Sequence, residues 1–568
     1  DKGVEMVEEA EVPARWADIE IPEEKIDENL PKWIRKIQMP VNAMKGDNIP
    51  VSDFTDLPDG TMPQGTSKYE KRGIAVNIPV WDSEKCIQCN MCSYVCPHAA
   101  IRPFLLTEEE AANAPEGMAT LPMTGMKEYK FTMTVSAYDC TGCGSCANVC
   151  PGKKGAKALA MENMEANAGL QKFFDYGREL PIKEDVIAKF KEATVKGSQF
   201  KQPLLEFSGA CAGCGETPYA KLITQLFGDR MYIANATGCS SIWGNSSPST
   251  PYTTNAKGQG PAWANSLFED NAEFGLGMFT GQNTLREQTK EKVVALAEST
   301  DNADVKAAAA EYLDTYADGS KNGAATDKLV AALEACGCDA AKEILAKKEF
   351  LSKKSQWIFG GDGWAYDIGF GGVDHVLASG EDVNVFVFDT EVYSNTGGQA
   401  SKSTNLGAIA QFQAAGKGTK KKDLAAIAMS YGYVYVAQIA MGADYNQTVK
   451  AIAEAEAYPG PSLVIGYAPC INHGIKGGMK IAQTEEKKAV TSGYWNLFRF
   501  NPALAAEGKN PFHLDSKAPT TEYEDFIMGE VRYNALSRQN PERAKALFAE
   551  AKANAEAKYN RLKEMSDK

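Results

Sequence analysis

Two cysteine-rich runs decide the first half of the fold: CIQCNMCSYVCP at residues 86–97 and CTGCGSCANVCP at residues 140–151. Both have the form C-x2-C-x2-C-x3-C-P, the spacing by which a chain holds a pair of [4Fe–4S] clusters. Three thiolates two residues apart can converge on one cluster, whereas the fourth begins a helix that leads toward the other cluster. The sequence therefore predicts a bacterial-type two-[4Fe–4S] ferredoxin module of α+β structure, and electron transfer as its task.

This spacing also predicts that the ligands of the two clusters are exchanged between the runs. One cluster is expected on Cys86, Cys89, Cys92 and Cys150, and the other on Cys140, Cys143, Cys146 and Cys96. The alternatives are a pair of zinc knuckles or a disulfide lattice. Zinc favours ligands in two pairs and does not require the repeated proline, so the clusters are the better interpretation.

Composition and charge narrow the class of protein. The chain has 568 residues and a formal net charge of −14, so we expect several domains and no nucleic acid partner, which would need a clustered basic face. We find no apolar run long enough for a membrane helix and no signal peptide. The cysteines have metal-ligand spacings, which are typical of a reducing cytoplasm. Because the chain begins with Asp1 rather than Met, we expect it to be processed or to be the last part of something longer.

Three regions are predicted along the chain. Residues 1–70 have irregularly spaced prolines and acidic residues, which predicts an extended arm or linker. Residues 71–185 hold the cysteine repeat and form the expected ferredoxin domain. In residues 186–568, short apolar runs alternate with helical or glycine-rich stretches, which predicts an α/β domain with a parallel sheet.

The expected strands of this sheet lie at residues 231–234, 356–359, 383–388, 433–438 and 462–467. A stretch rich in Ala, Glu and Lys at about 281–354 predicts an inserted helical hairpin. The last segment, about 520–568, predicts a helical tail.

Four further cysteines are candidates for a metal site. Cys211 and Cys214 form a C-x-x-C pair, and Cys239 and Cys470 follow two of the predicted strands. Strand ends meet at one edge of a parallel sheet, where ligands bind. The spacing leaves a third [4Fe–4S] cluster and a zinc site equally open.

The remaining thiols, Cys336 and Cys338, lie in an alanine-rich stretch and are expected to be plain thiols.

Two loops predict a site for a diphosphate and Mg²⁺. FGGDGW at residues 359–364 and DTEVYSNTGG at residues 389–398 each follow a predicted strand. Glycines let backbone N–H groups and a helix N-terminus approach phosphates. The Asp362 carboxylate, the Thr390 hydroxyl and the Val392 carbonyl are hard oxygen ligands of the kind that Mg²⁺ prefers.

Taken together, these motifs resemble the 2-oxoacid:ferredoxin oxidoreductases, and among them the pyruvate:ferredoxin oxidoreductases. The Gly-Asp-Gly loop and its partner are similar to the thiamine diphosphate motif of that family. The order of ferredoxin module, Cys-x-x-Cys-Gly-Glu and thiamine motif resembles the C-terminal half of these enzymes. Residues 65–72 (GTSKYEKR) and 271–275 (NAEFG) extend the resemblance over nearly the whole chain.

The resemblance implies roles for individual residues. It implies that Asp362, Thr390 and the Val392 backbone bind Mg²⁺, and that Cys211, Cys214, Cys239 and Cys470 hold a third [4Fe–4S] cluster. The implied thiamine diphosphate contacts are Glu216, Cys239, Gly361, Asp362, Gly363, Trp364, Thr390, Glu391, Val392, Tyr393, Ser394 and Asn395. Asn395 is implied to lie near the reacting carbon and is the catalytic candidate. Thr390 departs from many thiamine enzymes, which have Asn there, but a hydroxyl is still a hard donor.

The resemblance also implies an activity that this chain does not complete by itself. The expected reaction is oxidation of pyruvate with coenzyme A to acetyl-CoA and CO₂, with electrons passing through three clusters to ferredoxin or flavodoxin. The family's activating Glu and its coenzyme A site have no match in 1–568, so an N-terminal portion on the same or another chain is the expected partner. We expect the complete enzyme to be a cytoplasmic homodimer that binds neither nucleic acid nor membrane.

Two alternatives remain open at this point. One is a sister enzyme for indolepyruvate, 2-oxoglutarate or branched-chain 2-oxoacids, because the substrate is largely chosen by the absent part. The other is a non-catalytic electron carrier made of a ferredoxin fused to an inert α/β domain.

Overall fold

The computed structural model describes residues 2–20, 26–245 and 249–567 and divides the chain into two compact units, 1–63 and 64–568. Within the first unit the described residues form only short helical segments, among them α1 (Lys2–Glu5) and α2 (Met39–Asn42). The rings of Trp33 and Phe54 meet edge to face, with centroids 6.3 Å apart. Residues 1 and 21–25 of the predicted arm lie outside the described residues.

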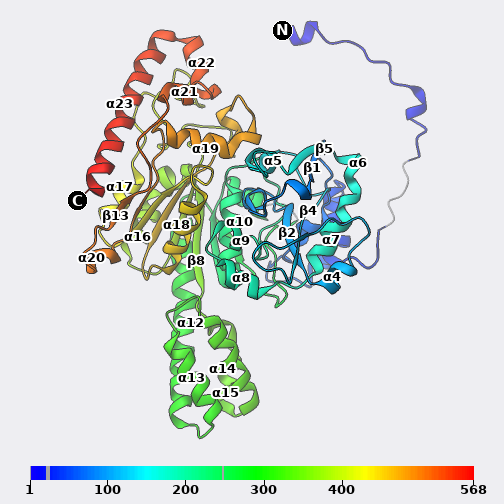
Figure 1. Ribbon diagram of the computed structural model, residues 1–568, viewed down its shortest axis with the longest axis vertical. Coiled ribbons are helices and arrows are strands. Elements are labelled where there is room, and N and C mark those ends of the chain that lie inside the picture. The colour runs from blue at the N-terminus through cyan, green and yellow to red at the C-terminus, as the bar shows by residue number, and fades with distance from the viewer. Residues whose placement is uncertain (1, 21–25, 246–248, 568) are drawn as a thin grey trace. The chain divides into compact units, whose positions relative to one another are not determined.

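An eight-stranded sheet forms the centre of the second unit (Figure 1). Its strand order is β13-β12-β10-β11-β9-β8-β6-β7. The strands are β6 (Met231–Ala236), β7 (Ala262–Ser266), β8 (Ser355–Gly361), β9 (Asn384–Asp389), β10 (Tyr435–Ile439), β11 (Ser462–Tyr467), β12 (Phe498–Phe500) and β13 (Phe512–Leu514). Strands β6 to β11 are parallel, and β12 and β13 are antiparallel strands at one edge.

The central strands are parallel because the chain crosses back through helices that cover both faces. Every residue of β9 and β11 is buried, as expected of parallel strands with helices on both sides. The parallel α/β fold predicted from the sequence is confirmed. Strand β7 and the three-residue edge strands β12 and β13 were not predicted, because runs this short give little periodic signal.

Further helices surround this sheet. They are α9 (Val195–Ser198), α10 (Thr217–Phe227), α11 (Cys239–Asn245), α16 (Phe370–Ala378), α17 (Leu424–Met429), α18 (Tyr445–Ala457), α19 (Ala482–Thr491), α20 (Ala503–Ala506), α21 (Tyr523–Ile527), α22 (Val531–Gln539) and α23 (Pro541–Ser566). Helix α8 (Glu184–Phe190) instead contributes Val186 and Ile187 to the apolar core around the cysteine repeat. No helix among the described residues is both long and apolar enough to cross a membrane.

The cysteine repeat folds into the predicted α+β module. Strands β1 (Asn77–Trp81) and β5 (Leu159–Asn163) pair antiparallel, and each cysteine run includes one short helix, α3 (Met91–Tyr94) or α5 (Ser145–Val149). The insertion between the runs forms the sheet β2-β4-β3, with β2 at Ile101–Leu106, β3 at Leu121–Pro122 and β4 at Lys130–Val135. The remaining helices here are α4 (Glu108–Ala112), α6 (Met164–Asn167) and α7 (Gln171–Glu179).

A buried lysine joins the module to the large sheet's helices. Lys221 of α10 donates from Nζ to the carbonyl oxygens of Ser93 and Tyr94, the latter at 2.9 Å. The two predicted domains thus lie in one compact unit. The boundary predicted between residues 185 and 186 stays a prediction.

A four-helix stalk stands out from the sheet (Figure 1, green). It consists of α12 (Asn271–Ser299), α13 (Ala303–Asp314), α14 (Asn322–Cys336) and α15 (Asp339–Leu345). The sequence suggested a hairpin beginning near residue 281. The longer α12 starts earlier, because its first turns pack on the sheet: a Cβ on Gly275 would lie 2.5 Å from Ile358.

Candidate functional site

Two cavities in the ferredoxin module are each lined by four cysteines. The lining of one includes Cys86, Cys89, Cys92 and Cys150. The lining of the other includes Cys96, Cys140, Cys143 and Cys146. These are the two sets that the sequence groups together, with one thiol exchanged between the runs.

The loops around these cavities direct backbone N–H groups at sulfur. Gln88 N lies 3.4 Å from Cys86 Sγ, and Gly142 N lies 3.4 Å from Cys140 Sγ. Gly142 has a φ of +69°, which glycine adopts at little cost, so the loop can curl at this point. Burial, with the neighbouring thiols, raises the pKa of Cys92 well above the ordinary value. Ligation would reverse this, because metal-bound thiols are deprotonated outright.

The third group of cysteines comes together at the carboxyl edge of the sheet. Gly215, which follows Cys214, donates its N–H to the Pro469 carbonyl at 3.1 Å, so the C-x-x-C loop lies against the residue before Cys470. Asn472 Nδ2 lies 3.7 Å from Cys470 Sγ. Burial raises the pKa of Cys470 to about 12, and the nearby Glu216 and Cys211 add to the shift.

A separate cavity opens beside Cys239. Its lining is Glu216, Thr237, Gly238, Cys239, Ser240, Phe268, Gly361, Gly363, Trp364, Val392, Tyr393, Ser394, Asn395 and Thr396. Nine of these residues are among the predicted thiamine diphosphate contacts. Cys239 Sγ also lies 3.1 Å from Ser394 Oγ in this wall. The same thiol is near enough to Cys211, Cys214 and Cys470 to interact with them electrostatically.

Glycine is needed where the two predicted loops meet. A Cβ on Gly363 would lie 2.4 Å from the Tyr393 ring, and one on Gly360 would lie 2.3 Å from the Trp364 ring. Any larger residue would separate the loops or close the cavity. The Trp364 Nε1 atom is buried without a protein partner and lies in this wall.

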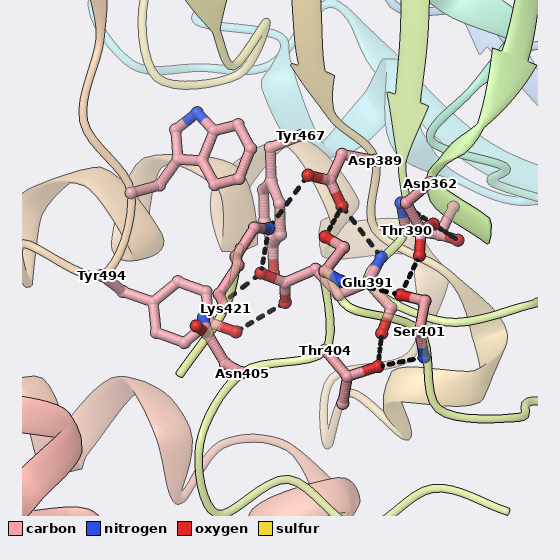
Figure 2. A network of polar contacts seen from close by, with 12 residues as sticks. Asp362, Asp389, Thr390, Glu391, Ser401, Thr404, Asn405, Lys421, Tyr467 and Tyr494 are labelled. Carbon is pink, nitrogen blue, oxygen red and sulfur yellow. Dashed lines mark hydrogen bonds and ion pairs between the residues drawn. The ribbon is translucent and has the colours of Figure 1, made fainter. Parts of the chain in front are cut away.

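Asp362 and Thr390, two of the three predicted magnesium ligands, lie side by side (Figure 2), and Thr390 also contacts the third, Val392. Thr390 Oγ1 is 3.0 Å from Asp362 Oδ1 and 3.0 Å from the Val392 carbonyl oxygen. Ser401 Oγ donates to the other carboxylate oxygen of Asp362 at 2.5 Å. Burial, with the nearby Asp389, raises the pKa of Asp362 well above its usual range. This donor set of one carboxylate, hydroxyls and a carbonyl suits a hard cation.

Glu391 was predicted as a cofactor contact, but its carboxylate is directed into a buried ionic network (Figure 2). Lys421 Nζ is 2.9 Å from Glu391 Oε1, and Arg532 Nη1 is 2.8 Å from Oε2. Tyr494 donates its hydroxyl to Oε2 at 2.5 Å. Glu391 has a φ of +61°, which is an unfavourable backbone conformation for a residue other than glycine. The ionic network around its side chain holds the residue in this conformation.

Sequence reasoning missed Ser401, Lys421 and Arg532. They lie outside both glycine-containing loops and reach the site only through the fold. Glu216 was predicted, and it lies buried at the start of α10. Trp243 Nε1 donates to its carboxylate at 2.7 Å, and burial raises the pKa of Glu216 to about 7.

Comparison with known proteins agrees with this arrangement. Residues 85–154 match the family described as "4Fe-4S dicluster domain", and residues 331–465 match "Thiamine pyrophosphate enzyme, C-terminal TPP binding domain". Residues 20–75 match a domain of unknown function named EKR. The chain thus contains a 4Fe–4S dicluster domain and a thiamine pyrophosphate-binding domain.

Relatives match the chain over its whole length. It is 55% identical to the pyruvate:ferredoxin oxidoreductase of Moorella thermoacetica, over 100% of this chain and 48% of the relative. It is 53% identical to the pyruvate-flavodoxin oxidoreductase of Klebsiella pneumoniae, over 99% of this chain and 48% of the relative. Over its whole length the chain is thus similar to pyruvate:ferredoxin and pyruvate-flavodoxin oxidoreductases. It spans about half the length of these relatives.

A third relative is larger still. The mitochondrial pyruvate dehydrogenase (NADP⁺) of Euglena gracilis is 46% identical over 99% of this chain, which covers 31% of that protein. The three relatives therefore share this segment within chains of different total length.

Proposed function

We propose that this chain is the cofactor-binding and electron-transfer part of an enzyme that oxidises pyruvate with coenzyme A to acetyl-CoA and CO₂, and reduces ferredoxin or flavodoxin. The observation that carries the proposal is the position of Cys239. Its thiol lines the cavity proposed for thiamine diphosphate and lies beside the other three cysteines proposed for a cluster. An electron donor and the first electron acceptor would then share one wall.

The diphosphate end of the cofactor would be held through Mg²⁺. The ligands in this proposal are the Asp362 carboxylate, the Thr390 hydroxyl and the Val392 carbonyl, which lie within hydrogen-bond distance of one another. Ser401 and the network around Glu391 would orient them, because buried ligands need partners that fix their direction.

Thiamine diphosphate, when bound, supplies the carbanion chemistry that decarboxylates a 2-oxoacid. The protein residues around it bind, orient and exclude water. Trp364 and Tyr393 form apolar walls, and Glu216 presents a buried carboxyl group. Asn395, like Thr396, is an exposed polar residue of the lining, and it is proposed to face the substrate.

Three [4Fe–4S] clusters would conduct the electrons. The third cluster is proposed on Cys211, Cys214, Cys239 and Cys470, and the other two on the crossed sets of the ferredoxin module. Each cluster accepts one electron at a time, whereas oxidation of a 2-oxoacid releases two, so several clusters in series fit the reaction. Cys211 is exposed, and cluster ligands close to the surface are suited to passing electrons between sites.

The proposed enzyme is incomplete in this chain, because its relatives are about twice as long. We propose that an N-terminal portion supplies the activating glutamate and the coenzyme A site, and that the complete cytoplasmic enzyme is a homodimer.

Reconstitution tests this proposal. Prepared anaerobically, the chain should contain about twelve iron atoms, as three [4Fe–4S] clusters require, and should bind thiamine diphosphate with Mg²⁺. Mixed with the N-terminal half of a relative, it should bleach its cluster absorbance on addition of pyruvate and coenzyme A. Bleaching with another 2-oxoacid but not pyruvate would favour a sister enzyme. Failure to bind thiamine diphosphate would favour a plain electron carrier.

A further inference from the structure

Two cysteines outside the three cysteine groups face each other at a turn of the stalk. Helix α14 ends at Cys336, and Cys338 precedes α15. Gly337 between them has a φ of +61°, and this left-handed conformation reverses the chain. As a result, the Sγ atoms of Cys336 and Cys338 lie 2.9 Å apart, closer than two unbonded sulfur atoms normally approach and longer than the ~2.05 Å of a disulfide bond.

The surroundings of the pair leave it reachable and activate one thiol. Both side chains are partly exposed at the margin of the stalk's small apolar core. The hydrogen bond from the Cys336 thiol, together with the Ala341 backbone N–H, lowers the pKa of Cys338 below the ordinary value. Reactive cysteines are those that are accessible and form the thiolate easily.

The pair is remote from every proposed cofactor. Gly275 near the start of α12 packs on the sheet, whereas Leu296 of the same helix belongs to the core on which Cys336 and Cys338 pack. An uninterrupted α-helix of that length separates the two places by roughly 30 Å, at 1.5 Å per residue. These thiols therefore have chemistry of their own.

We propose that Cys336 and Cys338 form a reversible dithiol–disulfide couple that exchanges with low-molecular-weight disulfides. The Cys338 thiolate attacks one sulfur of a disulfide RSSR, forms a mixed disulfide and releases RS⁻, which takes up a proton. The Cys336 thiolate then attacks the Cys338 sulfur, closes the protein disulfide and releases the second RSH. Two protein thiols are oxidised, and one RSSR is reduced to two RSH.

The resulting bond is suited to a redox role rather than a structural one. A disulfide stabilises mainly by closing a loop, and this ring contains a single intervening residue. Short rings depart from relaxed disulfide geometry, and such bonds are more easily reduced. The stalk packs through its apolar core in either state, so the couple can cycle without unfolding it.

One tryptic peptide isolates the pair. Cleavage after Lys328 and Lys342 releases LVAALEACGCDAAK (residues 329–342), which contains both thiols and no other cysteine. The cluster-loaded chain is equilibrated anaerobically in glutathione buffers of rising disulfide fraction, quenched in acid, alkylated and digested. We expect this peptide to become two hydrogens lighter and resistant to alkylation as the disulfide fraction rises, and a dithiol to restore double alkylation.

Two outcomes would overturn the proposal. One is a peptide that stays doubly alkylated in a large excess of glutathione disulfide. The other is a stable glutathione adduct that never closes to the ring. Cluster iron is measured in the same samples, so that thiols released from clusters are not mistaken for the pair.

Single substitutions separate the roles of the two thiols. Cys336→Ser should accumulate a glutathione adduct on Cys338, because no second thiol is present to displace it. Cys338→Ser should react about tenfold more slowly, because the remaining thiol lacks the hydrogen bonds that favour the thiolate. Equal rates in the two variants would overturn the assignment of Cys338 as the attacking thiol. None of these measurements depends on thiamine diphosphate or pyruvate, so they succeed or fail independently of the proposed function.

Discussion

The Asp362 carboxylate is the side chain on which the proposed cofactor site most depends. It is fully buried and accepts from Thr390 and Ser401, whereas the nearby Lys421 is paired with Asp389 and Glu391. A buried carboxyl group with hydroxyl partners but no counter-ion of its own is costly to ionise. A bound Mg²⁺ would provide that counter-ion, which explains why such a group is placed behind a cavity.

A variant that lacks the negative charge of Asp362 should still fold but should bind the cofactor more weakly. Asp362→Asn keeps the size and both hydroxyl contacts but removes the charge, so we expect Mg²⁺–thiamine diphosphate to bind at least about tenfold more weakly. Titration calorimetry of the cluster-loaded chain measures this. Asp374→Asn is the matched control, because Asp374 lies on the following helix α16, outside the proposed site, and accepts from Tyr431 at 2.7 Å. Equal affinity in Asp362→Asn and wild type would contradict the magnesium assignment.

Helix α19 shows how an element of this fold is fixed by a buried carboxyl group. Glu486 Oε2 accepts the Gly442 N–H at 2.7 Å, and Gln483 Nε2 donates to Oε1 at 3.1 Å. The Tyr219 hydroxyl of α10 lies 3.3 Å away. One side chain thus links two helices and the loop after β10. Burial raises the pKa of Glu486 to about 8 from an ordinary value of 4.5.

This shift predicts a pH dependence of stability. A carboxyl group whose pKa is raised by folding binds its proton more tightly in the folded state than in the unfolded state. The contribution of Glu486 to the free energy of unfolding is therefore complete below about pH 4.5 and is lost as the pH rises through about 8. Glu486→Gln should abolish that loss. The difference in unfolding free energy between pH 5 and pH 8, measured anaerobically in urea, should therefore narrow by on the order of 3 kcal/mol.

The control for this variant is Glu524→Gln, because Glu524 is exposed on α21. It should retain the wild-type pH dependence. A Glu486→Gln protein with an unchanged slope between pH 5 and pH 8 would show that Glu486 is ionised in the folded chain.

At the scale of the whole molecule, the two cysteine runs are interlocked. Each cavity takes three thiols from one run and one from the other, so neither set of four exists until both runs have folded together. The module should therefore gain its clusters as a unit, because metal binding and folding are coupled when a site is assembled from distant segments.

Alkylation of single variants tests the crossed assignment. In Cys150→Ser, the three thiols in residues 86–92 should become reactive toward iodoacetamide, because their cluster loses its fourth ligand. In Cys96→Ser, the three thiols in residues 140–146 should become reactive instead. Each variant is the control for the other, and peptide mapping by mass spectrometry is the measurement. The reverse pattern would show that each run holds its own cluster.

The predictions from sequence succeeded where chemistry depends on spacing. The C-x2-C-x2-C-x3-C-P runs and the loops around Asp362 and Thr390 are local, so their residue types indicate their ligands directly. The parallel strands β8, β9 and β11 were also evident, because strands buried on both faces are continuous apolar runs. Prediction failed for Lys421 and Arg532, because their contacts with Glu391 join residues 30 and 141 positions apart in the chain. It also failed for the short edge strands, which are too short to show a period.

The amino-acid sequence by itself determined the kinds of site in this protein: thiols at cluster spacing, and glycines and hard oxygen donors at diphosphate spacing. Only the tertiary structure decided which groups share a cavity. It brought Cys239 into the wall beside Asn395, directed the Glu391 carboxylate away from that cavity, and placed Cys336 against Cys338. The physical reason is that local patterns specify what a residue can bind, whereas packing of the sheet and the stalk specifies which residues are within reach of one another.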